Sequence, residues 1–173
     1  RQVYIANASA LDWEDITRDN THLYIGDIGN NEGNRTDLCI YKIPLSDLEN
    51  DTAYATKISY SYPDQTDFSP RNQNHNFDAE ALIAMGDSLY IFSKNWQDLR
   101  SKCYTLPKDT GTHIAQLSDE FYVGGLITGA EFDPIDSLIF LTAYTKLLAP
   151  FVYLLWDFDQ QPFSGNKRKI DIP

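Results

Sequence analysis

Three glutamates, Glu14, Glu80 and Glu131, each stand near the start of a short run that precedes a turn and an apolar segment. The three runs are Asp12–Ile16, Asp78–Leu82 and Gly129–Asp133, and the apolar segments after them are Leu23–Asp27, Leu89–Phe92 and Leu138–Leu141. Repetition of this kind indicates several copies of one structural unit. If the units share a centre, the three carboxylates meet there and repel one another. A proton on one carboxyl group, a bound cation or hydrogen-bond donors can relieve such repulsion.

Three chemical roles are therefore open for these carboxylates. In the first, Glu14, Glu80 and Glu131 are metal ligands, and their hard oxygen donors favour Ca²⁺. In the second, which is the plainer structural interpretation, each glutamate accepts backbone N–H groups from the neighbouring unit. In the third, one of them acts as a general acid or base, with Glu80 as the candidate.

The segment Gly26–Arg35 leaves the first apolar segment as a loop rich in glycine and asparagine. Its glycines permit positive φ, and the side chains of Asp27 and Asn30 can bind a ligand or their own backbone. One interpretation is a ligand-binding surface formed by Asp27, Asn30 and Arg35. The other is a structural turn in which Arg35 bonds Asp27 or a carbonyl group. The segment lacks the Lys-Ser/Thr ending of a phosphate loop, which argues against a nucleotide site.

A long polar segment, Asn72–Asp78, leads to Glu80. Within it His75 is a candidate base or ligand beside Asp78, although a surface loop is the simpler interpretation. The chain offers no serine or cysteine with a plausible base, so nucleophilic catalysis has no support.

Lys94 and Trp96 follow the second apolar segment, and Tyr144 follows the third. In a repeated arrangement these three positions lie on loops at one end of the shared centre. A cation beside aromatic rings can bind a sugar or an anionic group, and simple packing is the alternative.

Composition limits the class of protein. The chain has 173 residues, enough for one domain with a sizeable core, and its eleven tyrosines, nine phenylalanines and three tryptophans favour strands over helices. A formal charge of −11 disfavours nucleic acid and anionic membranes as partners. No apolar run is long enough to span a membrane. Cys39 and Cys103 are too few for a disulfide framework, and we expect two buried free thiols.

Each unit continues into two more strand-like runs. The third runs of the first two units stop at prolines, Pro44 and Pro107, as strands do because proline cannot donate to a ladder. Four runs per unit predict four-stranded antiparallel sheets, and helical periodicity is nearly absent. We therefore expect an all-β chain of about three β-propeller blades, with a β-sandwich as the rival. The predicted blades span residues 8–63, 77–124 and 127–173, and residues 1–6 form the last strand of a preceding blade.

Three blades do not close a ring, because propellers have about four to eight. We expect the chain to be a slice of a six-bladed propeller. Its end blades would then associate with the remaining blades of the same protein or with another copy.

The repeated segments resemble a family of uncharacterised secreted bacterial β-propeller proteins. The residues that carry the resemblance are Asp12–Ile16, Leu23–Asn31, Arg35, Ile40–Pro44, Phe77–Leu82, Tyr90–Lys94, Ile127–Asp133 and Tyr144. The resemblance implies a secreted, periplasmic or cell-surface location and carries no established activity. More remotely, the chain is similar to the calcium-dependent lactonase and phytase-like six-bladed propellers, but it matches none of their metal-binding motifs residue for residue.

These observations give three hypotheses for function. The first is a binding or scaffold domain for a small molecule, glycan or protein, with an acidic central channel that holds Ca²⁺. The second is a metal-dependent hydrolase of the lactonase or phosphoesterase kind. The third is a purely structural module of a larger cell-surface protein, which needs neither metal nor small ligand.

Overall fold

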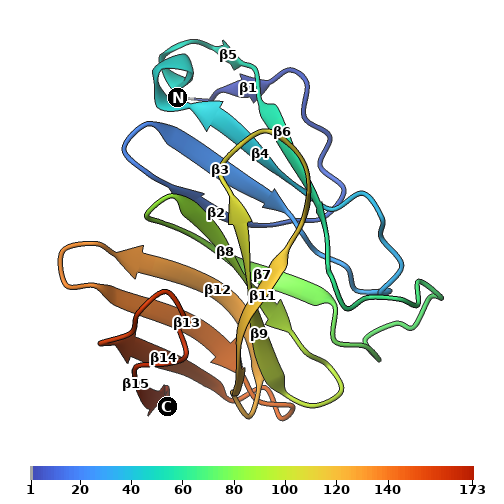
Figure 1. Ribbon diagram of the computed structural model, residues 1–173, viewed down its shortest axis with the longest axis vertical. Coiled ribbons are helices and arrows are strands. Elements are labelled where there is room, and N and C mark those ends of the chain that lie inside the picture. The colour runs from blue at the N-terminus through green and yellow to red at the C-terminus, as the bar shows by residue number, and fades with distance from the viewer. Residues whose placement is uncertain (1) are drawn as a thin grey trace.

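The computed structural model describes residues 2–173 and shows an all-β chain, which confirms the all-β part of the prediction (Figure 1). A single short 3₁₀ helix, η1 (Leu45–Glu49), interrupts the strands of this described part. The strands are β1 (Tyr4–Ile5), β2 (Trp13–Arg18), β3 (His22–Asp27), β4 (Cys39–Pro44), β5 (Thr52–Ala53), β6 (Thr56–Ser61), β7 (Asp78–Met85), β8 (Ser88–Lys94), β9 (Arg100–Pro107), β10 (Gly111–Ile114), β11 (Gln116–Tyr122), β12 (Leu126–Asp133), β13 (Leu138–Tyr144), β14 (Pro150–Trp156) and β15 (Asn166–Asp171).

Three meandering antiparallel sheets make up most of the molecule. The first runs in the order β2-β3-β4-β6, the second in the order β7-β8-β9-β11, and the third in the order β12-β13-β14-β15. β4 and β9 end at Pro44 and Pro107, as predicted. Figure 1 shows the sheets following one another from the blue end of the chain to the red end. Four-stranded sheets of this kind fit propeller blades.

Three short strands, β1, β5 and β10, lie outside these four-stranded sheets. β10 leaves the second unit and adds to the outer edge of the first sheet, where it pairs in parallel with β6. The ammonium group of Lys108, just before β10, forms an ion pair with Asp19 of the first unit at 2.9 Å. A strand pairing and an ion pair therefore link the second unit to the outer edge of the first. β1 pairs in parallel with β5 in a separate two-stranded sheet, so a strand is present over Tyr4–Ile5 within the predicted range 1–6, of which residue 1 lies outside the described residues. Its place in a preceding blade stays a prediction.

The core lies between the sheets. One apolar cluster joins the first sheet to the second and includes Ile40 and Leu89, and another joins the second to the third and includes Phe92 and Ile139. β8 is consequently buried on both faces from Leu89 onward, which explains why its sequence is apolar without alternation. A smaller cluster lies on the outer face of the first sheet under the N-terminal segment.

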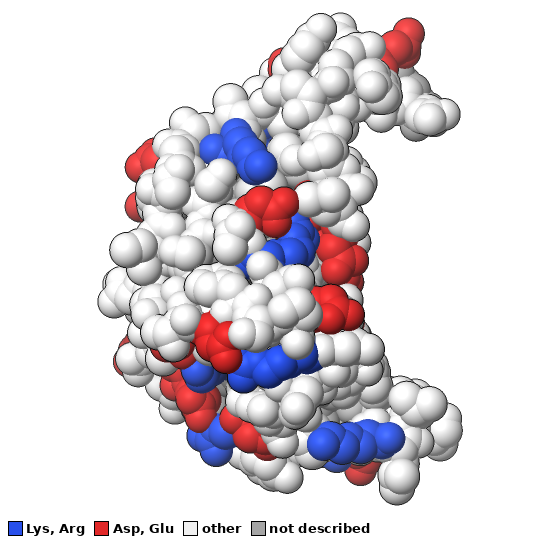
Figure 2. Space-filling view, turned by 90° about the vertical axis from the view of Figure 1, so that its right-hand side faces the viewer, with Lys and Arg blue, Asp and Glu red and all other residues white. Residues whose placement is uncertain are grey.

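The first strands of the three sheets meet. One carboxylate oxygen of Asp15 in β2 accepts the backbone N–H of Leu82 in β7 at 2.9 Å and that of Ala130 in β12 at 3.3 Å. The hydroxyl of Thr17 accepts the N–H of Ala84 at 3.2 Å. The role predicted for the glutamates, joining neighbouring units through N–H bonds, is thus performed by Asp15. In space-filling view the molecule is a crescent, and acidic side chains lie along the middle of its hollow edge (Figure 2).

Both cysteines are buried free thiols, as predicted. In the described part of the chain, no helix has the length and apolar character needed to cross a membrane.

Candidate functional site

A β-bulge in each first strand determines which side chains occupy equivalent places. The bulges lie between Trp13 and Asp15 and between Ala79 and Ala81, which leaves Glu14 and Glu80 outside the regular ladder. Bulges redirect side chains and are frequent beside functional sites. Glu14 and Glu80 are therefore equivalent, in agreement with the repeat alignment.

The third glutamate does not belong to this set. The bulge of β12 lies between Ile127 and Gly129, so Thr128 occupies the place of Glu14 and Glu80. Glu131 lies farther along β12, opposite Phe140, and is exposed. The predicted equivalence of Glu131 was wrong because the third hairpin is longer than the other two and moves the bulge away from the glutamate.

Glu14 is the centre of an acidic group. Burial, followed by the charges of Glu80 and Asp12, raises the pKa of Glu14 to about 8. A side-chain hydrogen bond with Asp12 contributes to the same shift, so Glu14 favours its protonated form near neutral pH. The backbone of Gly29 packs against both: a Cβ at this residue would lie 2.3 Å from an oxygen of Asp12 and 2.5 Å from one of Glu14. Any larger residue at this position would push the pair apart.

Glu80 has a different partner. The ammonium group of Lys94 lies 2.5 Å from a carboxylate oxygen of Glu80, and the Lys94 side chain is only 5% exposed. The same ammonium group lies 4.6 Å from the centre of the Trp96 ring and 5.3 Å from that of Tyr144. Lys94, Trp96 and Tyr144, which the sequence placed on neighbouring loops, are thus brought together around one charge. Burial alone would lower the pKa of Lys94, but the hydrogen bond and charge of Glu80 raise it.

Asp78 accepts hydrogen bonds from both the first and the second unit. One of its oxygens accepts the N–H groups of Asn30 at 2.7 Å and Ala79 at 3.1 Å. The other accepts the indole N–H of Trp96 at 2.9 Å. Asp78 therefore orients Trp96 and is fully buried itself.

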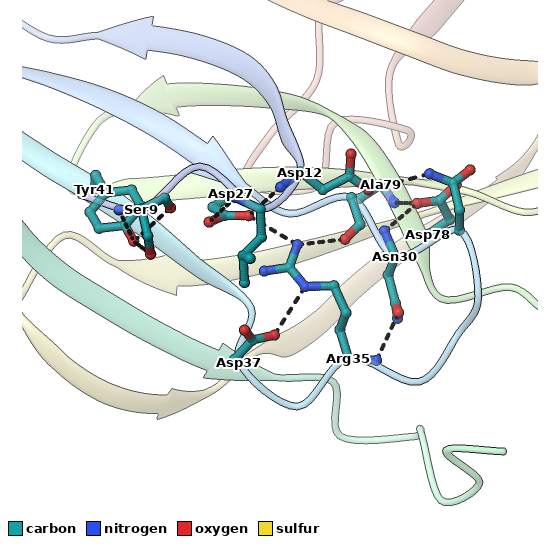
Figure 3. Close-up of polar contacts among 12 residues, drawn as sticks. Ser9, Asp12, Asp27, Asn30, Arg35, Asp37, Tyr41, Asp78 and Ala79 are labelled. Atoms are coloured by element: carbon teal, nitrogen blue, oxygen red, sulfur yellow. Dashed lines mark hydrogen bonds and ion pairs between the residues drawn. The ribbon is translucent and has the colours of Figure 1, made fainter. Parts of the chain in front are cut away.

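Ion pairs and hydrogen bonds of Arg35 and Asn30 fix the loop that was predicted as a binding surface (Figure 3). Arg35 forms ion pairs with Asp27 and Asp37, both at 3.0 Å, and donates to the carbonyl of Gly29 at 2.7 Å. This confirms the expected bonds of Arg35 to Asp27 and to a carbonyl group. The amide of Asn30 donates to Phe77 and accepts from the N–H of Arg35. Asp27 and Asn30 are each 1% exposed, so these residues shape the loop that carries Gly29.

His75 is not on the surface. It is 3% exposed, and its Nδ1 accepts the N–H of Phe77 at 3.1 Å while its Nε2 lies 3.0 Å from the carbonyl of Asn31. This pairing requires the neutral tautomer with its proton on Nε2, which donates to Asn31. The ring also packs against Gly33, where φ is +71° and an added Cβ would lie 2.7 Å from the imidazole. Both ring nitrogens form hydrogen bonds within the protein, so His75 has a structural role.

A cavity of about 410 Å³ opens beside Lys94. Two of its walls are the aromatic residues Trp96 and Tyr144, and the others are Gln73, Leu126, Lys146 and Leu148. Of these six residues, only the aromatic pair was predicted from the sequence. The other four lie on turns and strand ends that carry no motif.

Glu14, Glu80 and Glu131 were predicted as ligands of Ca²⁺. Among residues 2–173 no three His, Cys, Asp or Glu side chains surround one point closely enough to hold a metal ion. The donors explain why: Glu80 is bonded to Lys94, and both oxygens of Asp78 accept N–H groups. A positive charge already lies among the acids, and it belongs to Lys94. The residues as arranged do not fit a calcium site.

No protein-family model matches the chain, and no curated protein matches it.

Proposed function

We propose that this protein is a binding domain of the β-propeller type, whose ligand is a neutral, hydroxyl-rich molecule such as a glycan held in the cavity beside Lys94. The three four-stranded sheets are the blades, and β2, β7 and β12 line the shared centre. The observation that carries the proposal is the enclosure of Lys94 by Glu80, Trp96 and Tyr144 at the wall of a 410 Å³ cavity.

The walls of the cavity suit such a ligand. The rings of Trp96 and Tyr144 offer apolar faces, while Gln73 and Lys146 offer donors and an acceptor. Ligand sites commonly combine aromatic walls with a few polar groups. Sugar hydroxyls can both donate and accept, so they can satisfy this mixed set.

The surrounding charge argues for a neutral ligand. The ammonium group of Lys94 is neutralised by Glu80, and the negative charges of Asp78 and Asp12 act on the same Glu80 carboxyl group. Together with the net charge of −11, these carboxylates would repel an anion.

Binding of a panel of neutral mono- and oligosaccharides, measured by titration calorimetry, tests the proposal. Tyr144→Ala removes one wall and should weaken binding by about tenfold or more, the loss of roughly 1.4 kcal/mol. Tyr122→Ala is the matched control, because Tyr122 is 56% exposed at the end of β11 and does not line the cavity. The proposal fails if no saccharide binds or if the two variants bind alike.

A second candidate function is hydrolysis, and one observation favours it. With a pKa of about 8, Glu14 keeps its proton near neutral pH, so it can act as a general acid toward a leaving group. Turnover of lactones or phosphate esters by the wild-type protein, lost in Glu14→Gln, would support this function. The same panel should show no turnover if the protein only binds.

A further inference from the structure

Among residues 2–173, no other sheet covers one face of the third sheet. β13 alternates between buried residues (Ile139, Leu141 and Ala143) and exposed ones (Phe140 and Thr142). Its sequence, however, is apolar on both sides, as is that of β8, which lies between two sheets. The buried side packs on the second sheet. The opposite side is called here the outer face of the third sheet.

Cross-strand pairing places an ordered row of side chains on this outer face. Glu131 pairs with Phe140, Phe140 with Leu154, and Leu154 with Arg168. The row thus begins with an acid on β12 and ends with a base on β15, with two large apolar side chains between them. Phe140 is 36% exposed, and Ile170 in the neighbouring row is 39% exposed. Glu131 and Arg168 take part in no ion pair with another residue of the described chain.

We propose that the outer face of the third sheet binds a second copy of this chain, face to face, around a two-fold axis through the middle of this row. The row is complementary to itself when it is reversed: Glu131 then faces Arg168 of the second copy, and Arg168 faces its Glu131. Phe140 and Leu154 pack in the centre and are removed from water. A two-fold interface uses the same patch on both copies, so self-complementary charge is the property it requires. A partner of uniform charge would leave one end of the row unmatched.

Sedimentation velocity on the whole chain over a wide concentration range tests the proposal. The wild-type protein should show a reversible monomer–dimer equilibrium. Glu131→Arg alone places two arginines together at each end of the interface, and Arg168→Glu alone places two glutamates there. Each should raise the dimer dissociation constant by about tenfold, because like charges directly opposite one another are destabilising. The double variant Glu131→Arg/Arg168→Glu restores opposite charges and should return the constant to near its wild-type value.

Glu49→Arg, an exposed charge reversal in η1, is the matched control and should leave the equilibrium unchanged. Both residues of the swap are exposed, so the variants should fold normally, which circular dichroism will verify. A wild-type protein that is monomeric at every concentration overturns the proposal, as does a dimer that ignores the charge reversals. None of these substitutions lines the cavity beside Lys94, so failure here leaves the binding proposal standing.

Discussion

The carboxylate of Asp15 in β2 accepts the N–H of Leu82 in β7 at 2.9 Å, and the same oxygen accepts that of Ala130 in β12 at 3.3 Å. One side chain thus joins the first strands of all three sheets. Burial raises the pKa of Asp15, although its three backbone N–H donors lower it. Partial burial of the Asp15 carboxylate is unfavourable, but its hydrogen bonds fix the three sheets relative to one another. This geometry positions Glu14 and Glu80.

Replacing Asp15 by alanine should destabilise the protein. Asp15→Ala leaves the N–H groups of Leu82 and Ala130 without an acceptor, which should cost about 2 kcal/mol in the free energy of unfolding. Asp15→Asn keeps an acceptor oxygen and should cost clearly less. Urea unfolding followed by circular dichroism measures both, with the exposed Asp136→Ala as control. Equal losses in the alanine and asparagine variants would show that these hydrogen bonds do not join the sheets.

The all-β class and the four-stranded sheets could be predicted because local signals mark each strand. Each strand can be recognised from its own residues, either by an alternating or continuous apolar run or by a proline at its end, as at Pro44 and Pro107. The bulge in β12 has no such signal. Glu131 follows an alanine, as Glu80 does, but the longer third hairpin places Thr128 at the bulge instead. Register of this kind depends on the whole hairpin, because one added residue turns every side chain to the other face.

The residues of the candidate site could be predicted from the sequence better than the contacts between them. Lys94, Trp96 and Tyr144 were named because they follow second strands, and they do meet. They meet around the ammonium group of Lys94, whose ion-pair partner is Glu80, the residue that the sequence suggested as a metal ligand. Pairing of an ammonium group with a carboxylate across two strands leaves no pattern in a single sequence. β10 was missed for the same reason, since its partner β6 belongs to another unit.

The stability of the protein should depend on Glu14 in the neutral range. Its folded-state pKa of about 8 lies above the ordinary value of 4.5, so the folded protein holds a proton that the unfolded chain has lost. The contribution of this group to stability is fully present below 4.5 and is lost as pH rises through 8. The melting temperature of the wild-type protein should therefore fall from about pH 5 to about pH 9, and Glu14→Gln should flatten this slope. Glu131→Gln is the control and should keep the wild-type slope, since its side chain is exposed. Parallel slopes in wild type and Glu14→Gln would contradict the raised pKa of Glu14.

The pair of Lys94 and Glu80 should behave as one unit. Lys94→Met leaves a partly buried carboxylate without its cation and should lower the free energy of unfolding by about 3 kcal/mol. The double variant Lys94→Met/Glu80→Gln removes both charges and should recover a substantial part of this loss. Lys146→Met, at an exposed position of the same cavity, should have little effect on stability. Additive losses in the double variant, measured by urea unfolding, would mean that the two side chains do not interact.

The ion pair between Asp19 and Lys108, which links the first two units, should be lost in acid. Asp19 accepts hydrogen bonds from Thr21, His22 and Tyr24 and pairs with Lys108 at 2.9 Å. Burial raises the pKa of Asp19, but the hydrogen bonds from Lys108 and Thr21 outweigh it and hold the pKa well below its usual range. A depressed pKa contributes stability above the unfolded value of about 4, and this contribution is lost as pH falls below it. Asp19→Asn should therefore lower the melting temperature at neutral pH and reduce the further loss below about pH 4, while the exposed Asp136→Asn should follow the wild-type curve. If Asp19→Asn and wild type instead lose stability in parallel on acidification, the charge of Asp19 does not stabilise the contact between the first two units.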